Sequence, residues 1–535
     1  MTSPKSQKQK ISVDWGITII PLLAVLALAV FLIFFPDRAT ASIELLRGFV
    51  INNTGFTFSL VAIGMFILSF YLSFSKFGNI KLGKLEKPRY SNLSWMAMIL
   101  TSCMAVDFIF WGTLEWAYYF VESPLGMENM TLAQRADWAA AYPLFHWGPM
   151  PWMMYTVPAA ALGYMMFVKK RPKQRASEAC RSVLGSRVDG VLGKAIDIFV
   201  IVALLASTSI SFALGTPVLT EVISEVTGIP SSQGMSVVML LMIGVLFTLA
   251  VLFGIKGISK LSNVAFTFYG LLLAIFLVLG PTRYIIETGI TAFGHSLQNL
   301  VSMSTWLDPL RVTSADGTMG FPQTWTVFYY AWWVAWSIAA PFFIAKISEG
   351  RTIRQTIMGG CLAGTASTLV SFIIFGNFGL HIQTSGKIDL AGMLASGSAT
   401  PGELFVMIYN ELPMSKIMMV VAIITMVTLC ASTFDAMSLT ISSYSLKNPK
   451  EGEESDWKLR VFWSLVLILL PMALIFTEAP LSTLQALTIL GAVPIMVILI
   501  IVIVGFVRDL KRDTLQAVPA ETPAEEAAPV SEETE

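Results

Sequence analysis

Aromatic side chains recur at helical spacing in one apolar stretch of the chain. Residues 321–336 hold four of the 14 tryptophans, and four aromatic residues follow one another at intervals of four, three and four: Trp325, Tyr329, Trp332 and Trp336. This spacing predicts a stripe along one face of an α-helix, about 16 Å long. Ring faces without a metal ligand or nucleophile suit a quaternary ammonium group, held by cation–π attraction of about 2 kcal/mol in a dry site. Aromatic packing between helices is the alternative.

A second aromatic set precedes this stripe. Residues 145–152 read Phe-His-Trp-Gly-Pro-Met-Pro-Trp, and Tyr155 follows them.

Polar residues also interrupt two apolar segments. Asp107 lies near the middle of the segment 92–122, with Glu115 two turns later. Such a carboxylate either bonds to a neighbouring helix or serves as a titratable, cation-facing group on a transport path. In the segment 413–446, Ser432 and Thr433 could ligate Na⁺ together with the backbone around Met104, or simply bond between helices.

Composition determines which elements can position these residues. Of the 535 residues, 55% are hydrophobic and 13% charged, and the mean hydropathy is +0.70. A soluble protein carries roughly twice that charged fraction, so a soluble enzyme, a disordered chain and a nucleic-acid-binding protein are excluded. At about 20 apolar residues per crossing, we expect an all-α, polytopic membrane protein. About twelve apolar segments have spanning length: 15–35, 54–77, 92–122, 141–169, 192–225, 236–256, 262–286, 322–347, 355–379, 413–446, 458–477 and 482–508.

Basic residues alternate between the loops that join these segments. One set of loops is rich in lysine and arginine, as in 76–89, 169–175, 256–260, 346–354, 447–460 and 508–512, whereas the opposite loops hold scattered cations. This positive-inside pattern predicts a multi-pass protein of the bacterial inner membrane with both termini in the cytoplasm.

The segments divide the chain into six parts: a cytoplasmic tail 1–14, spans 1 and 2 in 15–90, spans 3–7 in 91–286, an interfacial helix and outer loop in 287–321, spans 8–12 in 322–508, and an acidic, disordered tail 509–535. The four cysteines and three histidines are scattered, so we expect no disulfide framework, no metal cluster and no cofactor. Motifs for ATP hydrolysis or for a membrane hydrolase are absent from the sequence, and we expect no enzyme activity.

Three motifs give the sequence a family resemblance. Residues 325–333, residues 345–352 (Ala-Lys-Ile-Ser-Glu-Gly-Arg-Thr) and residues 145–152 resemble the betaine/carnitine/choline transporter family, and the last is closest to the carnitine/γ-butyrobetaine antiporter branch. The resemblance implies a LeuT-like fold with two inverted five-helix repeats, a substrate site between spans 3 and 8, and a homotrimer. By position it implies a central aromatic box with an outer approach: Trp332, Trp333, Trp336, Tyr118 and Trp111 in the box, and Trp325 and Tyr329 in the approach.

Departures from the family pattern bear on mechanism. Ala265 and Ala340 stand where antiporter members carry an arginine and a methionine, whereas residues 432–435 resemble the sodium-site stretch of ion-coupled members. Asp107 replaces a glycine of the sodium-coupled betaine carriers and matches an aspartate of proton-coupled choline carriers. A buried carboxylate can balance a cationic substrate or take up a proton. The short acidic tail differs from the basic tail of osmosensing members.

We therefore expect a secondary transporter that imports glycine betaine, carnitine or choline by symport with Na⁺ or H⁺. An ion-independent substrate/product exchanger and a proton-coupled choline carrier using Asp107 are the alternatives within this fold. The alternative from a different functional class is a membrane sensor or channel whose aromatic box only reports ligand.

Overall fold

The protein is a helical bundle in a computed structural model that describes residues 12–102, 107–122, 124–127, 129–171, 173–252, 255–314, 317–447 and 456–516. Every regular element in these ranges is a helix, and two isolated bridges join Val13 to Leu446 and Lys81 to Thr352. The expected all-α fold is confirmed. Met104, predicted to take part in ion coupling, lies outside the described residues.

Ten described helices have seventeen residues or more, and they form the body of the bundle together with shorter helices that flank breaks. The long helices are α1 (Trp15–Phe34), α2 (Pro36–Phe74), α9 (Val191–Thr227), α10 (Gln233–Leu252), α11 (Ile255–Leu279), α12 (Thr282–Gln298), α16 (Gly360–Thr384), α19 (Ser415–Ser445), α20 (Trp457–Phe476) and α21 (Leu481–Gln516). The helices that flank breaks are α3 (Asn92–Ser102), α4 (Asp107–Val121), α5 (Leu132–His146), α6 (Pro149–Gly163), α14 (Val327–Trp336) and α15 (Ala339–Ile347). Short helices include α7 (Ala176–Ala179), α8 (Arg181–Leu184), α13 (Leu300–Thr305), α17 (Leu390–Ser396) and α18 (Pro401–Asn410).

Length and apolar composition mark seven described helices as candidate membrane spans, or nine if each of two bent pairs counts as one span. One pair is α11 and α12, which are bent by 107° relative to each other. The other is the helical segment Pro322–Trp336, which includes α14, and α15, which are bent by 56°. The expected segments 92–122, 141–169 and 236–256 are covered by shorter or paired helices. The count of twelve and the inverted repeats therefore stay predictions.

Several helix boundaries differ from those expected. α2 begins at Pro36, well before residue 54, and α5 begins at Leu132, before residue 141. Pro36 opens α2 because proline fits the first helical turn. A capping box between Thr131 and Gln134 starts α5, and hydrophobicity alone does not reveal this signal.

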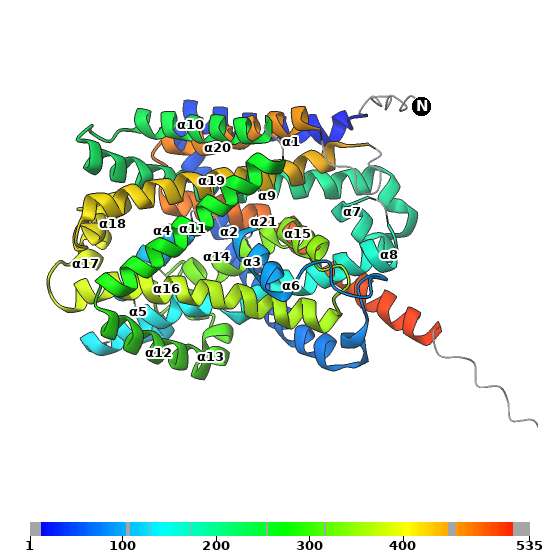
Figure 1. The fold of residues 1–535 in the computed structure, drawn as a ribbon, viewed down its shortest axis with the longest axis horizontal. Coiled ribbons are helices and arrows are strands. Elements are labelled where there is room, and N and C mark those ends of the chain that lie inside the picture. Colours follow the sequence, from blue (N-terminus) through cyan, green and yellow to red (C-terminus); the bar gives the residue numbers. More distant parts are fainter. Residues whose placement is uncertain are drawn as a thin grey trace, which may run out of the picture.

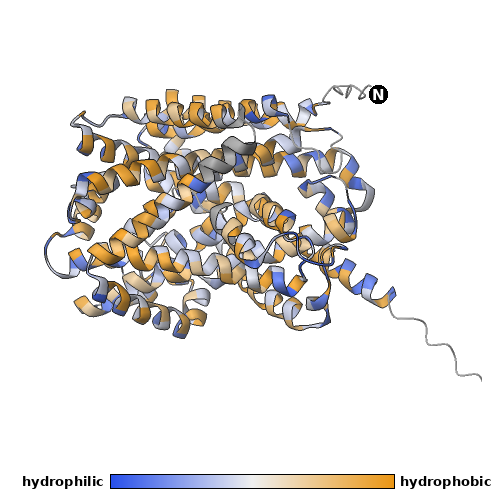
Figure 2. Ribbon diagram, in the orientation of Figure 1, coloured by the Kyte–Doolittle hydropathy of each residue, from blue (hydrophilic) through white to orange (hydrophobic). Residues whose placement is uncertain are grey.

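The outer surface is apolar along the long helices. Figure 2 shows hydrophobic residues along the helices and hydrophilic residues gathered near their ends and connections. On α1 and α2, large side chains stay exposed, such as Leu23, Leu60 and Ile67 at 57%, 61% and 63%. A soluble protein rarely exposes so much apolar surface, and lipid is its natural cover.

α14 packs inside the bundle. It contacts α21, α2, α9 and α6, and α4 packs against α5 and α16 nearby. In Figure 1, α1, α10 and α20 lie along one edge of the bundle and α12 and α13 along the opposite edge, with α14 between them. Side chains of α14 therefore face protein on most sides.

Contacts at one end of the bundle join both ends of the described chain. The Asp14 N–H donates to the Ser445 carbonyl, Arg175 donates to the Leu446 carbonyl, and Arg171 pairs with Asp509 of α21. The start of α1 and the end of α21 thus lie at the same end.

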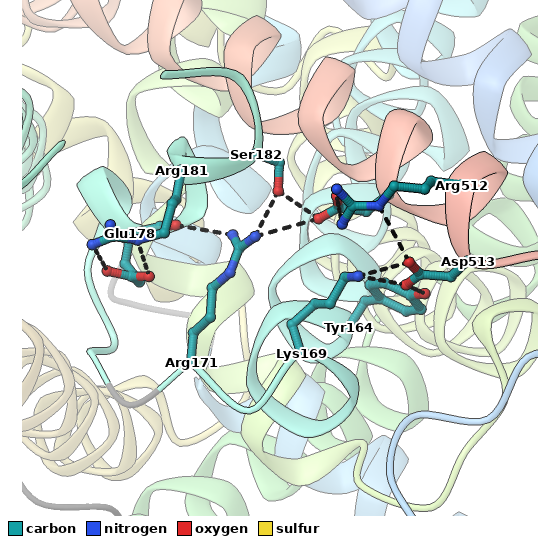
Figure 3. A network of polar contacts seen from close by, with 9 residues as sticks. Tyr164, Lys169, Arg171, Glu178, Arg181, Ser182, Arg512 and Asp513 are labelled. Carbon is teal, nitrogen blue, oxygen red and sulfur yellow. Dashed lines mark hydrogen bonds and ion pairs between the residues drawn. The ribbon is translucent and has the colours of Figure 1, made fainter. Parts of the chain in front are cut away.

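A polar network fastens α21 to the segment that follows α6 (Figure 3). The Asp513 carboxylate accepts hydrogen bonds from Lys169 Nζ at 2.7 Å and from the Tyr164 hydroxyl at 2.6 Å. Arg171 donates to Ser182 Oγ at 2.7 Å and lies 3.5 Å from Asp509. Each acidic group of α21 thus meets a donor from the 164–182 segment, and these contacts hold the two segments against each other.

Exchanging the charges of Lys169 and Asp513 tests this attachment. We expect Lys169→Asp and Asp513→Lys each to lower the unfolding temperature of the purified protein by several degrees, because each places like charges together. The double exchange should recover at least half of the loss, with a coupling of about 1 kcal/mol in a double-mutant cycle. The same exchange at the exposed pair Arg283 and Glu287 serves as the control and should show little coupling. Additive losses at 169 and 513 would contradict the attachment.

Candidate functional site

The predicted aromatic stripe lies on a broken helix. A π-helical turn, Pro322–Thr326, leads into α14, which ends at Trp336, and α15 starts at Ala339 after a bend. Ser337 and Ile338 sit in the break, where the Ser337 hydroxyl donates to the Val334 carbonyl. A helix broken inside a bundle exposes main-chain groups and side chains to a ligand, a common arrangement in transporters.

Trp111 of α4 is the centre of the first ring cluster. Its ring centroid lies 6.3 Å from Trp325, 6.0 Å from Tyr329 and 6.5 Å from Trp332. Tyr118, about two turns further along the same face of α4, lies 6.1 Å from Trp111 and 5.1 Å from Trp325. The structure therefore brings together five of the seven aromatic residues predicted to bind substrate, and their rings face the protein interior, not lipid.

Trp147 joins the second aromatic set to this cluster. Its ring centroid lies 5.1 Å from Trp332, at an interplanar angle of 89°, and 5.7 Å from Tyr329. Trp147 also lies 5.8 Å from Trp333, which in turn packs 4.6 Å from Tyr155. The aromatic residues of 145–152 are evident from the sequence. Their contact with α14 is not, because it depends on tertiary packing that local spacing does not predict.

Trp333 and Trp336 occupy different positions from the other box residues. Trp333 faces α6, where it meets Tyr155 and, at 5.4 Å, Trp152. Trp336 is partly exposed at the end of α14. Among the described residues, neither its buried Nε1 nor that of Trp111 has a hydrogen-bond partner. The aromatic box predicted at Trp332, Trp333 and Trp336 is thus spread over more than one face of α14.

The break between α5 and α6 explains how Trp147 is held. The His146 carbonyl ends α5 and has no donor within that helix, and Pro149, which opens α6, has no N–H. The Trp333 indole N–H donates to that carbonyl at 3.1 Å, and the Thr368 hydroxyl donates to the Trp147 carbonyl at 2.7 Å. Gly148 permits the turn, because a Cβ there would lie 2.4 Å from the Leu144 carbonyl oxygen.

The described residues that were predicted to couple ions lie on two helices, α4 and α19. Asp107 starts α4, is buried, and accepts a hydrogen bond from Ser211 of α9 at 2.6 Å. Ser432 and Thr433 each donate back to a carbonyl of their own helix, Thr428 and Leu429, at 2.9 and 3.1 Å. Their oxygens keep lone pairs that a cation could use. Ser211 and Thr433 flank a stacked pair, Phe212 and Phe434, so the neighbourhoods of Asp107 and Thr433 adjoin.

Two acidic groups near these positions already have partners. Asp435 forms an ion pair with Arg460 of α20. Glu115, named beside Asp107 from the sequence, bonds to Tyr119 and Trp147 at 2.6 and 2.8 Å. Within the described ranges, no three histidine, cysteine or acidic side chains gather as a metal site would require.

A polar turn before Pro322 positions the aromatic segment. The Asp308 carboxylate accepts from the Val312 N–H and from the Thr313 N–H and hydroxyl, at 2.9, 2.9 and 2.6 Å. The Thr313 hydroxyl also accepts from the Phe321 N–H at 2.9 Å. Burial tends to raise the pKa of Asp308, but these hydrogen bonds outweigh it and leave its pKa below the ordinary value. The turn thus ties residue 321 to a carboxylate that stays ionised.

Asp308→Asn tests this turn through pH. Because the native-state pKa is lowered, the stabilisation is complete above the unfolded-state value of about 3.9 and is lost as the pH falls through the native-state pKa. The variant should therefore unfold several degrees below the unaltered protein at pH 7, and this gap should close towards pH 3. Glu86→Gln, at an exposed loop position, is the control for general acid effects. A gap that stays constant with pH would contradict the role of the ionised carboxylate.

Fold and site together define a multi-pass membrane protein whose broken helix carries a buried aromatic cluster, and comparison with known proteins gives its family. Residues 16–515 match the family described as BCCT, betaine/carnitine/choline family transporter. The chain is 33% identical over 457 residues to "Uncharacterized transporter YeaV" of Escherichia coli (strain K12), which covers 85% of this chain and 92% of that protein. It is 32% identical over 450 residues to a "Carnitine transporter" of Acinetobacter baumannii, which covers 84% of this chain and 80% of that protein.

The chain belongs to the betaine/carnitine/choline transporter family, which confirms the resemblance seen in its motifs. Family membership makes it a bacterial transporter, not an enzyme.

Proposed function

We propose that the protein is a secondary active transporter that imports a quaternary ammonium compound of the glycine betaine, carnitine or choline type. The buried ring cluster of Trp111, Trp147, Tyr329 and Trp332 carries this proposal, because closely spaced electron-rich rings attract a cation that cannot form hydrogen bonds. The relative described as a carnitine transporter agrees with this substrate class. A zwitterion or a simple cation with a trimethylammonium head fits the same rings.

Transport by this site requires that access alternate between the two membrane faces. The bend after Trp336 and the break between α5 and α6 place flexible points on both sides of the cluster. Rocking of the two halves of the bundle about these points would expose the cluster to one side and then the other. Trp325 and Tyr329 are proposed to line the outer approach, as the family resemblance implies.

Trp332→Ala tests the cluster as the substrate site. Loss of a dry cation–π contact of about 1.4 kcal/mol should weaken the binding of the transported compound roughly tenfold or more. Affinity is measured by titration of the purified protein with glycine betaine, carnitine and choline. Trp457→Ala, at a tryptophan that is 50% exposed, is the matched control and should bind normally. Unchanged affinity in Trp332→Ala and Trp336→Ala would remove the cluster from substrate binding.

Coupling to Na⁺ is the proposed source of energy. The Ser432 and Thr433 hydroxyls, with the backbone around Met104, supply the oxygen ligands that Na⁺ prefers, and Ala265 leaves no arginine charge in place of an ion. Asp107 favours a second candidate, a proton-coupled choline carrier. It is buried, accepts a hydrogen bond from Ser211 and is next in sequence to Phe108, whose ring lies 5.3 Å from Trp147 of the cluster. The exchanger of the carnitine/butyrobetaine type remains the ion-independent alternative.

Reconstituted uptake with separate ion gradients distinguishes these mechanisms. We expect accumulation of substrate under an inward Na⁺ gradient, and Thr433→Ala should raise the Na⁺ concentration for half-maximal uptake about tenfold by removing one ligand. Asp107→Asn should leave the Na⁺ dependence in place. Uptake driven by a proton gradient alone and abolished by Asp107→Asn would instead support the proton-coupled carrier. Counterflow that needs neither gradient and survives both substitutions would support the exchanger.

The same proposal includes orientation and assembly. The end of the bundle that carries Arg171, Arg175 and Arg512 is proposed to face the cytoplasm, following the positive-inside rule, together with the start of α1 and the end of α21. A homotrimer in the bacterial inner membrane is the assembly that the family resemblance implies.

A further inference from the structure

A chain of buried polar groups lies directly behind the aromatic cluster. The Tyr119 hydroxyl lies 2.6 Å from Glu115 Oε1 and 2.8 Å from His146 Nδ1, and His146 Nε2 lies 3.1 Å from the Thr326 hydroxyl. Each of these four side chains is at most 1% exposed. The chain therefore joins α4, the end of α5 and the turn before α14 without access to water.

Glu115 connects this chain to a ring of the cluster. Its second oxygen, Oε2, accepts from the Trp147 indole N–H at 2.8 Å. An indole nitrogen can only donate, so Glu115 must accept at this oxygen in any protonation state. Tyr119 can donate to the other oxygen, and an ionised carboxylate, which only accepts, then has a donor on each oxygen.

Among the described residues, the single ion-pair contact of Glu115 is with the His146 ring, 3.6 Å from Oε1. In the part of the chain that the structure describes, no arginine or lysine side chain lies within ion-pair distance of it. The negative charge of an ionised Glu115 is therefore not cancelled by a permanent cation, and burial leaves it poorly screened.

The Trp147 ring connects Glu115 to the proposed substrate site. On its other sides, the ring meets Trp332 at right angles and Tyr329 at 69°, the two residues of α14 at the centre of the cluster. A hydrogen bond from an indole N–H to a carboxylate is charge-assisted and draws the proton away from the ring, which leaves the ring face more negative. Cation–π attraction grows with the negative potential of that face.

We propose that Glu115 is a positioning residue that sets the preference of this site for a cationic headgroup over an uncharged one of the same shape. It fixes the Trp147 ring against Trp332 and Tyr329. Its negative charge polarises the Trp147 indole through the N–H hydrogen bond, which strengthens the attraction of the cluster for a quaternary ammonium group. This inference rests on the proposed function, because it assumes that the headgroup binds beside Trp147.

A purely structural role for Glu115 can be separated from this one. Glu115→Gln keeps the size and every hydrogen bond: its amide oxygen accepts from Trp147, and its amide nitrogen donates to Tyr119. The Tyr119 hydroxyl then donates to His146 Nδ1, and His146 Nε2–H donates to Thr326, so the chain reverses direction and stays paired. Only the negative charge is lost.

Binding of two matched pairs of compounds measures the preference. Glycine betaine is compared with 3,3-dimethylbutanoate, and choline with 3,3-dimethyl-1-butanol, in which a carbon replaces the quaternary nitrogen. The ratio of the two dissociation constants within a pair is determined by titration of purified, full-length protein, using the pair whose cation binds. A change in packing alone weakens both members of a pair and leaves the ratio unchanged.

The unaltered protein should bind the cation at least tenfold more tightly than its carbon analogue. In Glu115→Gln, this ratio should fall at least fivefold, mostly through weaker binding of the cation. Glu122→Gln is the matched control: Glu122 accepts from the Trp325 indole at 2.8 Å in the same way but is partly exposed, so its charge is screened. Its ratio should change less than twofold.

Two different results would overturn two different claims. A ratio near one in the unaltered protein would remove the proposed cation site itself. A large ratio that Glu115→Gln leaves unchanged would overturn the role of Glu115 and keep the site. Should Glu115→Gln not fold, Trp147→Phe provides the second test, because it keeps a ring but lacks the N–H that links it to Glu115. An unchanged ratio in Trp147→Phe would overturn the inference, and a fivefold fall would support it.

Discussion

A main-chain carbonyl that loses its helical partner inside a membrane-spanning bundle has no water to bond with, and this constraint shapes the whole centre of the protein. The helices break where the cluster lies, and the carbonyls at the break between α5 and α6 accept hydrogen bonds from other helices. The Trp333 indole donates to the last carbonyl of α5, and the Thr368 hydroxyl donates to the carbonyl of the turn that follows. The same side chains that satisfy the backbone also hold the rings, so the aromatic cluster and the breaks depend on each other.

Much of the fold follows from the sequence, but the detailed site does not. The apolar segments, the aromatic stripe of α14 and the polar residues of α4 could be recognised from spacing and hydrophobicity, because a lipid environment permits few alternatives to a helix. The capping box at Thr131 and the proline at the start of α2 moved helix starts away from the apolar boundaries. The partnership of Trp147 with Trp332 and Tyr329 could not be predicted, because it joins helices far apart in the chain.

The two carboxylates of α4 show why burial alone does not define a role. Asp107 accepts a hydrogen bond from a hydroxyl of α9 and lies at the start of its helix, next to residues outside the described structure. Glu115 sits two turns later with donors on both oxygens, one of them an indole of the cluster. From the sequence the two looked alike. Their partners distinguish them: Asp107 stays a candidate for ion coupling, whereas Glu115 is placed to hold the Trp147 ring.

The bond from the Trp333 indole to the His146 carbonyl also limits which side chains position 333 can accept. This carbonyl ends α5 and has no donor within its own helix, and Trp333 supplies one from a distant part of the chain. A phenylalanine or leucine there would keep an apolar side chain but leave the oxygen unpaired where burial makes that costly. The tryptophan is thus needed for its nitrogen as well as for its ring.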